Sequence, residues 1–545
     1  MEKLVYLKPN VVMEPLVDGW YAWSHLISPG TAAMNITGRH MKIMQSFVQA
    51  PQIHEAAVRN PKMLGGPFMD IPATRVEEVK GLQNDIQVKR ERVIELSNAI
   101  QELNQVLKDH PAGFSLDTAY EKVPDLLKGY VELVYDLNNN PTFRFFEPLL
   151  YNSDLYDEGM QSIAFWVTEN DDRPFVLSTP RLDEEDVLHL NIPFRHEFID
   201  AISRMKRTPQ PLSSVLDLVD LTEDQKALFE TFFTEEAPPA YERYTGDKVR
   251  MRYFGHACIL VETKDVSILV DPLISYYGYF QEVDRFSDMD LPDQIDYVLI
   301  THNHQDHILF ETLLPLRHKI KNVVVPKTTA GSLQDPNLRL MFNHIGFDNV
   351  IELGELETVN LHDVTITGVP FVGEHSDLNI HSKLCHHVQV GEFKIMFVAD
   401  SCNLEPRLYD NVSKLVGNVD VVFLGMECDG APLSWLYGPL LPEELSRDKD
   451  ASRRLAGSNY ERGKNLVHSF DPKEVYIYAM GMEPWLKFIS SISYTDESNP
   501  IIASNKLIDT CREEGRIAER LFGEKELLYN KQEEEEAVEL KKLAA

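Results

Sequence analysis

Hydrophobic residues in the first half of the chain follow the patterns of both helices and strands, and one long helix stands out. Across residues 74–108, apolar side chains recur every three or four positions, which predicts an amphipathic helix with a heptad-like stripe. Thr74 and Glu77 have the spacing of a capping box, which would start this helix. The stripe either packs on its own domain or joins two copies of the chain, and the pattern leaves both interpretations open.

Shorter elements complete this first region. Residues 120–137 and 221–233 have helical periodicity, whereas the β-branched and aromatic side chains of residues 162–167 favour a strand. We find neither a catalytic motif nor an internal repeat in residues 1–235. The sequence therefore predicts an N-terminal mixed α+β domain and places the chemistry elsewhere.

The pattern changes after a polar segment, residues 236–248, which contains two adjacent prolines and reads as a linker. From residue 249 onward, short apolar strands alternate with helical stretches, which is typical of an α/β sandwich. We predict a second domain over residues 249–525 and an acidic tail over residues 526–545, whose last residues resemble a vector remnant. Two domains suit a length of 545 residues, because single cores stop growing at about 250–300 residues.

The composition argues against several classes of function. The chain has 53 Lys and Arg residues against 86 Asp and Glu residues, and this net charge of −33 repels nucleic-acid backbones. No apolar run is long enough to cross a membrane, and no signal-peptide pattern opens the chain. The five cysteines are widely spaced, which argues against a disulfide scaffold. We expect a cytoplasmic protein that binds neither nucleic acid nor membrane.

Candidate chemistry is concentrated in one loop. Directly after the apolar run of residues 297–300, the sequence places His302, His304, Asp306 and His307 within six positions. Because His302 and His304 are two residues apart, an extended backbone would direct both to the same side. Asp306 and His307 follow in the turn and can reach a second centre. Two adjacent metal ions would explain why one loop supplies four ligand-type side chains, so the loop predicts a dinuclear metal site.

This HxHxDH pattern after a strand resembles the metallo-β-lactamase superfamily. The Gly-His-Ala motif around His256 resembles that superfamily's opening strand pair, and the strand ending in Asp271 resembles the one whose Asp braces the metal loop. The resemblance implies an αββα sandwich for the second domain. It also implies a bridging carboxylate at Asp400, which directly follows the predicted strand of residues 394–399.

Two positions depart from the superfamily's pattern. No His follows the strand of residues 475–478, where the superfamily places its last metal ligand and this chain has Ala479. The segments around Glu374, Asp400, Glu427 and Ala479 together resemble a small diiron branch of the superfamily. This narrower resemblance implies that Glu374 replaces the usual His ligand.

The type member of that branch is the β-hydroxylase of chloramphenicol biosynthesis, which acts on an aromatic amino acid held as a thioester on a nonribosomal peptide synthetase. The resemblance therefore implies a non-haem diiron monooxygenase that uses O2 to β-hydroxylate an amino acid in antibiotic-type biosynthesis. The implied partner is a carrier (thiolation) domain of such a synthetase. The branch also carries an N-terminal domain associated with dimerisation, so a homodimer is expected, and this domain would shape the substrate channel.

The implied ligand set fits iron and oxygen chemistry. Two His and one carboxylate with open positions is the set that non-haem Fe(II) oxygenases favour. Reduction of O2 takes four electrons and the C–H bond supplies two, so an external reductant must supply the rest. No GxGxxG segment follows a strand, and a separate electron donor is expected. The implied metal ligands, of which Glu374 and Asp400 are also the candidate catalytic residues, are His302, His304, Asp306, His307, Glu374 and Asp400.

Neighbouring residues leave alternatives open. His375 could replace Glu374 as a metal ligand, and only the resemblance to the diiron branch separates the two. His256 could support the metal loop or contact the substrate, and Asp377 could orient a ligand or cap a turn. Asp271 is expected to brace the loop. Further candidates for lining the pocket are Glu427 and Asp429.

The main alternative function is a zinc-dependent hydrolase of the same fold. It requires only the HxHxDH loop and Asp400, and hydrolases also need an open metal position. A non-catalytic relative is a weaker alternative, because all six ligand types are present.

Overall fold

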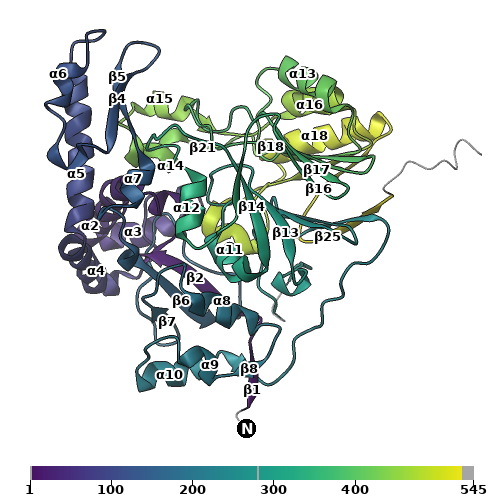
Figure 1. The fold of residues 1–545 in the computed structure, drawn as a ribbon, viewed down its shortest axis with the longest axis horizontal. Helices are drawn as coiled ribbons and strands as arrows, with labels where there is room; N and C mark the ends of the chain where they lie inside the picture. Colours follow the sequence, from purple (N-terminus) through teal and green to yellow (C-terminus); the bar gives the residue numbers. More distant parts are fainter. Residues whose placement is uncertain (1–2, 279–281, 531–545) are drawn as a thin grey trace, which may run out of the picture.

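The computed structural model describes residues 3–278 and 282–530 of the chain. Its C-terminal half contains two facing seven-stranded sheets with helices on their outer sides, which is the αββα sandwich expected from the sequence (Figure 1). The first sheet has the order β15-β14-β13-β12-β11-β10-β25. Its strands are β10 (Val249–Tyr253), β11 (Ile259–Glu262), β12 (Ser267–Val270), β13 (Ile295–Leu299), β14 (Ile320–Pro326), β15 (Val350–Leu353) and β25 (Lys525–Tyr529).

The second sheet has the order β16-β17-β18-β19-β20-β23-β24. Alternate residues of β19 face opposite sides, as strand geometry requires. Ile395 and Phe397 pack into the core between the two sheets, whereas Met396 and Val398 pack on the opposite side under the outer helices. The strands are β16 (Thr358–Leu361), β17 (Val364–Val369), β18 (Cys385–Val390), β19 (Phe393–Phe397), β20 (Val421–Gly425), β23 (Glu474–Tyr478) and β24 (Ile517–Arg520).

Different elements cover the two outer faces of the sandwich. Helices α13 (Arg407–Val416), α16 (Tyr460–Phe470) and α18 (Asn499–Glu513) cover the second sheet, at the upper right of Figure 1. The first sheet carries α11 (Phe310–Leu316) and α12 (Leu338–His344), and α11 packs in turn against the N-terminal domain. The metal domain is therefore covered on one side by its own helices and on the other partly by the preceding domain.

The N-terminal domain has a four-stranded sheet of order β3-β2-β6-β7. Its central strand β2 is buried along its whole length and contacts α11 of the second domain. A small sheet, β8-β1-β9, and the β4–β5 hairpin complete the strands of this domain. Its strands and main helices are β1 (Leu4–Leu7), β2 (Val11–Val17), β3 (Trp20–Tyr21), β4 (Val131–Tyr135), β5 (Pro141–Phe145), β6 (Gln161–Val167), β7 (Leu188–Leu190), β8 (Gln210–Pro211), β9 (Phe233–Thr234), α1 (Pro29–Asn35), α2 (Met41–Gln49), α4 (Val76–Lys89), α5 (Glu91–Lys108), α8 (Glu197–Arg204) and α10 (Glu223–Glu230).

One hydrophobic core joins the two domains. Phe165 and Phe198 of the N-terminal domain belong to the same buried cluster as Leu313 and Phe342 of the second domain. Buried charges also cross the boundary, since Arg173 donates to both carboxylate oxygens of Glu311 at 2.9 Å. An unpaired buried charge is expensive, so these pairs hold the domains in one relative position.

The predicted long helix is two helices in the structure. Helix α4 ends and helix α5 begins at Arg90, whose backbone is not helical. The side chain of Arg90 forms ion pairs with Asp18 and Asp157. The capping box at Thr74 is wrong, because Thr74 lies in a short 3-10 turn and α4 starts after Arg75 without a side-chain cap. The predicted helix over residues 120–137 is also wrong, since this stretch contains β4.

The apolar stripe of α5 is buried inside its own domain. Leu96, Ile100, Leu103 and Leu107 are almost fully buried in the core, and α5 packs against α1. The stripe therefore gives no support to a contact between copies of the chain. Homodimerisation stays a prediction, which sedimentation velocity of the purified protein would test.

Two further elements of the N-terminal domain, the capped helix α10 and the strand β6, lie where the sequence predicts them. The segment of residues 236–248 contains no helix or strand. The predicted tail boundary falls inside β25, which pairs with β10 and extends the second domain to Tyr529. Residues 531–545, with the suspected vector remnant, lie outside the described residues.

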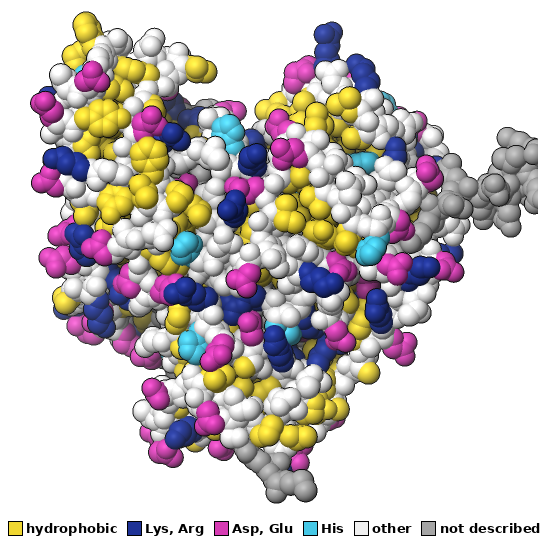
Figure 2. All heavy atoms as spheres, in the orientation of Figure 1, with side chains coloured by type: hydrophobic (Ala, Val, Ile, Leu, Met, Phe, Trp, Pro, Cys, Tyr) yellow, Lys and Arg dark blue, Asp and Glu magenta, His cyan; other side chains and the backbone are white. Residues whose placement is uncertain are grey.

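The surface mixes both signs of charge despite the acidic composition. Figure 2 shows Lys and Arg side chains interspersed with Asp and Glu over one face, and an indentation between the upper left and upper right lobes. Among residues 3–278 and 282–530, no helix combines the length and apolar character needed to cross a bilayer.

Candidate metal centre

The HxHxDH loop lies at the carboxyl end of β13, beside the end of β12. These two strands are parallel, so the residues that follow them meet at one edge of the sheet. Asp271, directly after β12, accepts hydrogen bonds from the backbone N–H of Thr301 at 2.8 Å and from its hydroxyl at 2.5 Å. Asp271 is fully buried and also lies 2.8 Å from Nδ1 of His307. It holds the loop in the way the sequence predicts.

Three side chains converge on a first possible metal position. Nδ1 of His304 lies 3.0 Å from Oε1 of Glu374, and Nε2 of His302 lies 4.0 Å from Oε2 of the same carboxylate. All three residues are buried. Glu374 belongs to the loop after β17 and has a φ of 64°, an uncommon conformation for a non-glycine residue that aims the side chain at the two His residues.

Asp400 stands between this group and the rest of the loop. Asp400 lies three residues after the end of β19. Its Oδ2 atom lies 3.1 Å from Nε2 of His307 and 3.8 Å from Nε2 of His302. Since Nδ1 of His307 faces Asp271, the other ring nitrogen is left to face Asp400. Asp400 thus contacts both His clusters, as a bridging ligand must.

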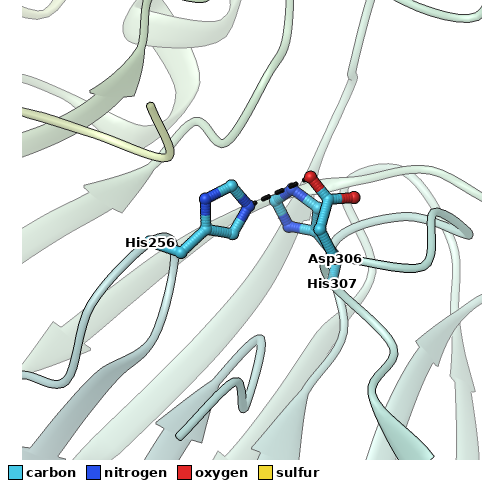
Figure 3. A group of neighbouring side chains, drawn as sticks. All are labelled: His256, Asp306 and His307. Atoms are coloured by element: carbon cyan, nitrogen blue, oxygen red, sulfur yellow. Dashed lines mark ion pairs between the residues drawn. The ribbon is translucent and has the colours of Figure 1, made fainter. Parts of the chain in front are cut away.

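A second group of possible ligands consists of His256, Asp306 and His307, the last of which also contacts Asp400. His256, from the turn between β10 and β11, has Nε2 at 3.2 Å from Oδ2 of Asp306, and its ring centroid is 5.0 Å from that of His307 (Figure 3). The ligand atoms of these three residues all lie within 4.8 Å of one another. His256 thus lies beside a candidate metal position and not merely behind it.

The residues of the cluster fit metal ions. Nε2 of His302 and Oδ1 of Asp400 are buried and have no hydrogen-bond partner among the described residues. Buried polar atoms are normally paired, because an unpaired one costs about 1–3 kcal/mol. Imidazole nitrogens and carboxylate oxygens gathered in one buried cluster, two of them unpaired, are donor types that a divalent transition metal binds.

Ionisation favours cation binding in this cluster. Burial opposes the charge of Glu374, but the imidazoles of His304 and His375 outweigh it and hold the pKa of Glu374 well below its usual range. Burial likewise opposes protonation of His307, yet the surrounding carboxylates raise the pKa of this imidazole well above its ordinary value. Both shifts show that the negative charge of the buried carboxylates favours a proton or a metal cation in this cluster.

Comparison with known proteins identifies the family. Residues 6–238 match the diiron non-heme beta-hydroxylase N-terminal domain, and residues 267–431 match the beta-lactamase superfamily domain. The chain is 39% identical over 94% of its length to the 4-amino-L-phenylalanyl-[CmlP-peptidyl-carrier-protein] 3-hydroxylase of Streptomyces venezuelae, covering 98% of that protein. The chain belongs to the diiron non-haem β-hydroxylase family.

Solved structures agree with this assignment. The crystal structure of CmlA, a diiron beta-hydroxylase from Streptomyces venezuelae, superposes with a TM-score of 0.91 at 38% identity, covering 97% of this chain and all of that one. A Pyrococcus abyssi protein of the UPF0173 group is 34% identical, but over only 23% of this chain and 50% of its own length. The likeness to the β-hydroxylases therefore covers both domains, which a hydrolase of the same fold does not explain. This chain is an O2-dependent non-haem diiron enzyme.

Ala479 stands where the superfamily's pattern would place its last His. Ala479 follows β23 and donates its backbone N–H to the carbonyl oxygen of His256 at 2.8 Å. The end of β23 thus meets the turn that carries His256, and no bulky side chain from Ala479 enters the site. Ala479 thus offers no metal-ligand atom from its side chain at this strand end.

A cavity of about 420 Å³ opens over the candidate metal ligands of the hydroxylase. Asp306, Glu374 and Asp400 lie at its floor, and Trp435 contributes to an apolar side wall. The N-terminal domain also reaches this cavity, through the loop that contains Leu64. The cavity is large enough for an amino-acid side chain, and both domains of the hydroxylase form it.

The remaining predicted residues divide into two sets. Glu427 lines the cavity, and burial raises its pKa to about 7 against the effect of backbone hydrogen bonds. His375 is buried beside the cluster, with Nδ1 at 2.9 Å from Oε2 of Glu374. The predicted pocket-lining role of Asp429 is wrong, because its side chain is exposed and does not line the cavity. Asp377 is also exposed and lies outside the cavity wall, so of its two predicted roles only that of capping a turn is left open. The Oδ1 atom of Asp429 instead accepts from Asn499 at 3.0 Å.

Sequence reasoning missed several residues of the site. The hydroxyl of Tyr437 lies 3.3 Å from Nε2 of His304, and Thr301 links the rings of His302 and His307 through its hydroxyl. Thr301 could have been found, since it opens the motif. Tyr437 and the N-terminal loop at Leu64 gave no signal, because nothing in their local sequence indicates that they meet the metal loop.

Proposed function

We propose that this chain hydroxylates the β-carbon of an amino acid that is held as a thioester on a carrier domain of a nonribosomal peptide synthetase. The observation that carries the proposal is the buried group of His302, His304 and Glu374, of which His304 and Glu374 line a cavity built by both domains. The hydrolase alternative requires only the HxHxDH loop and Asp400, and it gives no reason for a carboxylate at position 374. An aromatic amino acid is the expected class, because the cavity wall includes Trp435 and Ile489.

We infer that six side chains hold the two iron ions. When bound, the iron pair supplies the reduction of O2 and the insertion of one oxygen atom into a C–H bond. His302, His304 and Glu374 would hold one ion, Asp306 and His307 the other, with Asp400 between them. Asp271 keeps the proton on Nδ1 of His307, so that Nε2 is free to bind.

The chain's own residues would also orient the substrate and exclude water. The carrier arm fixes one end of the aminoacyl group, and the apolar side of the cavity fixes the other, which removes part of the orientation cost before the reaction. A separate electron donor remains part of the proposal. Its support is that reduction of O2 takes four electrons, of which the C–H bond supplies only two.

Mass spectrometry tests this function. Enzyme loaded with ferrous iron is reduced and exposed to air with carrier domains that bear single amino acids. We expect one aminoacyl carrier to gain the mass of one oxygen atom, and only when O2 and reductant are both supplied. A gain with zinc-loaded enzyme, or hydrolysis of the thioester instead, would refute the proposal.

A further inference from the structure

Glu427 occupies a distinct place in the wall of the cavity. It follows β20, the strand next to the one that carries Asp400, so both carboxylates lie at the same edge of the second sheet. Its side chain is half-buried and lines the cavity together with Glu374 and Asp400. The three groups of possible metal ligands found among the described residues do not include it.

The carboxylate of Glu427 has amide partners and no cation. It accepts hydrogen bonds from the backbone N–H groups of Asp429 at 3.3 Å and Gly430 at 2.6 Å. Within residues 3–278 and 282–530, no Lys, Arg or His forms an ion pair with it. Arg454, the guanidinium in the same cavity wall, donates instead to the backbone carbonyl oxygens of Asp429 and Gly430. Glu427 is thus a partly desolvated carboxyl group that the described residues leave without a counter-charge.

We propose that Glu427 binds the α-ammonium group of the aminoacyl substrate. This inference rests on the proposed function, because an aminoacyl substrate would bring an ammonium group into the cavity. Buried carboxylates are costly unless they are paired, and an ammonium group is the counter-charge that an aminoacyl thioester provides. The nitrogen is bonded to Cα, which is bonded to Cβ, so fixing the nitrogen limits where Cβ can lie relative to Asp400 and Glu374.

The same charge explains why a thioester suits this cavity better than a free amino acid. A free amino acid brings a carboxylate as well as an ammonium group, and Glu427 repels the former as it attracts the latter. Conversion to a thioester removes the negative charge and leaves a cation. The ammonium site therefore selects for loaded carrier over free amino acid, without any contact to the carrier itself.

A competing explanation is that Glu427 only caps its own turn through the two backbone amides. The two explanations separate in a substrate that lacks the ammonium group. A capping residue affects the folded turn equally whichever substrate is present. A residue that binds the ammonium group affects only the substrate that carries one.

The test measures dissociation constants with iron-loaded enzyme under anaerobic conditions, using fluorescence anisotropy of a labelled carrier. The carrier bears either the amino acid that the enzyme hydroxylates or its des-amino analogue. We expect the wild-type enzyme to bind the aminoacyl carrier about 10- to 100-fold more tightly, the range for hydrogen bonds to charged groups. Glu427→Gln should reduce this preference to about twofold or less, because Gln keeps an oxygen for the turn and loses the charge.

Two further variants make the test decisive. Asp429→Asn, in the same loop but outside the cavity, should keep the wild-type preference. Glu427→Asp keeps the charge and should retain part of it. Equal binding of both carriers by the wild-type enzyme would overturn the inference, even if no Glu427 variant folds. An unchanged preference in Glu427→Gln would overturn it as well. If the wild-type enzyme hydroxylates no aminoacyl carrier, this result refutes the proposed function, and it is distinguishable from a failure of the ammonium site, which the dissociation constants measure.

Discussion

The two domains contribute to one site by different means. In the metal domain, short segments at strand ends carry the chemistry, and Asp271, His302 and Asp400 lie within a few residues of β12, β13 and β19. In the N-terminal domain no chemical motif exists, yet its Leu64 loop lines the cavity and its Arg173 pairs with Glu311 across the boundary. The comparison teaches that reactivity is encoded locally, whereas the shape around it is encoded by packing between distant segments.

The largest effect is expected at the metal loop. His302→Ala removes a buried side chain that contacts both Glu374 and Asp400, so we expect hydroxylation to fall below detection. Iron content per chain, measured by plasma emission spectrometry, should fall with it. His468→Ala, an exposed His paired with Glu514, is the matched control and should keep both iron and activity. Full iron content in His302→Ala would remove this residue from the ligand set.

Across the domain boundary, Glu311→Gln should destabilise the protein without changing the chemistry. Glu311 is buried and binds Arg173 and the hydroxyl of Tyr21, so its loss leaves a buried guanidinium short of negative charge. Breaking such a pair costs about 3–5 kcal/mol. We expect a lower thermal unfolding midpoint with unchanged iron stoichiometry. Glu55→Gln, at an exposed pair with Arg59, should have little effect.

The stability of the same domain boundary should depend on pH through the carboxyl group of Glu147. This buried carboxyl group accepts the backbone N–H of Asn337 at 3.0 Å, and burial raises its pKa to about 7. Because the pKa of Glu147 is higher in the folded protein than the value of about 4.5 in the unfolded chain, folding favours its protonated form. Its contribution to the free energy of unfolding is therefore complete below a pH of about 4.5 and is lost as the pH rises through about 7. Glu147→Gln should remove this loss, a few kcal/mol at most.

Thermal midpoints of wild type and Glu147→Gln, compared from pH 5 to pH 8 in about half-unit steps, would check this. The difference between them should grow with pH. A constant difference would show that Glu147 keeps an ordinary pKa and that the boundary is insensitive to pH.

A moderate effect is expected where the metal loop is braced. Asp271→Asn keeps the size of the side chain and its left-handed backbone, but weakens the contact with Nδ1 of His307. Substitutions of this kind usually lower metal affinity or activity by about 10- to 100-fold. Titration of the metal-free protein with Co(II), followed by its visible spectrum, would measure the change. Unaltered affinity would mean that the backbone alone positions His307.

The smallest effect probes whether the N-terminal domain takes part in chemistry. Leu64→Ser changes a half-exposed side chain of the cavity wall, so we expect the KM for the loaded carrier to rise about two- to fivefold while kcat stays the same. Leu137→Ser, at an exposed hairpin tip, is the control. A large fall in kcat would break the division between the two domains.

Local patterns predicted what local interactions determine. The HxHxDH loop and the strands of the sandwich could be predicted because ligand spacing and apolar runs lie within a few residues. Glu374 was predicted only through resemblance, since nothing near it separates it from His375. Residues 120–137 were predicted as helix, but β4 forms there because Val131–Tyr135 pairs with β5. Asp429 shares a loop with Glu427, and only the fold of that loop decides which carboxylate faces the cavity.

Strand β25 has a consequence for how the chain is made. It forms the edge of the first sheet and pairs with β10, the first strand of the same domain. The first and last strands of the domain are therefore joined by backbone hydrogen bonds. Until the last part of the chain leaves the ribosome, β10 presents unpaired backbone groups to any neighbouring strand. Deletions that reach Lys525 should therefore yield aggregates during synthesis, even though every residue of the metal centre has already been made.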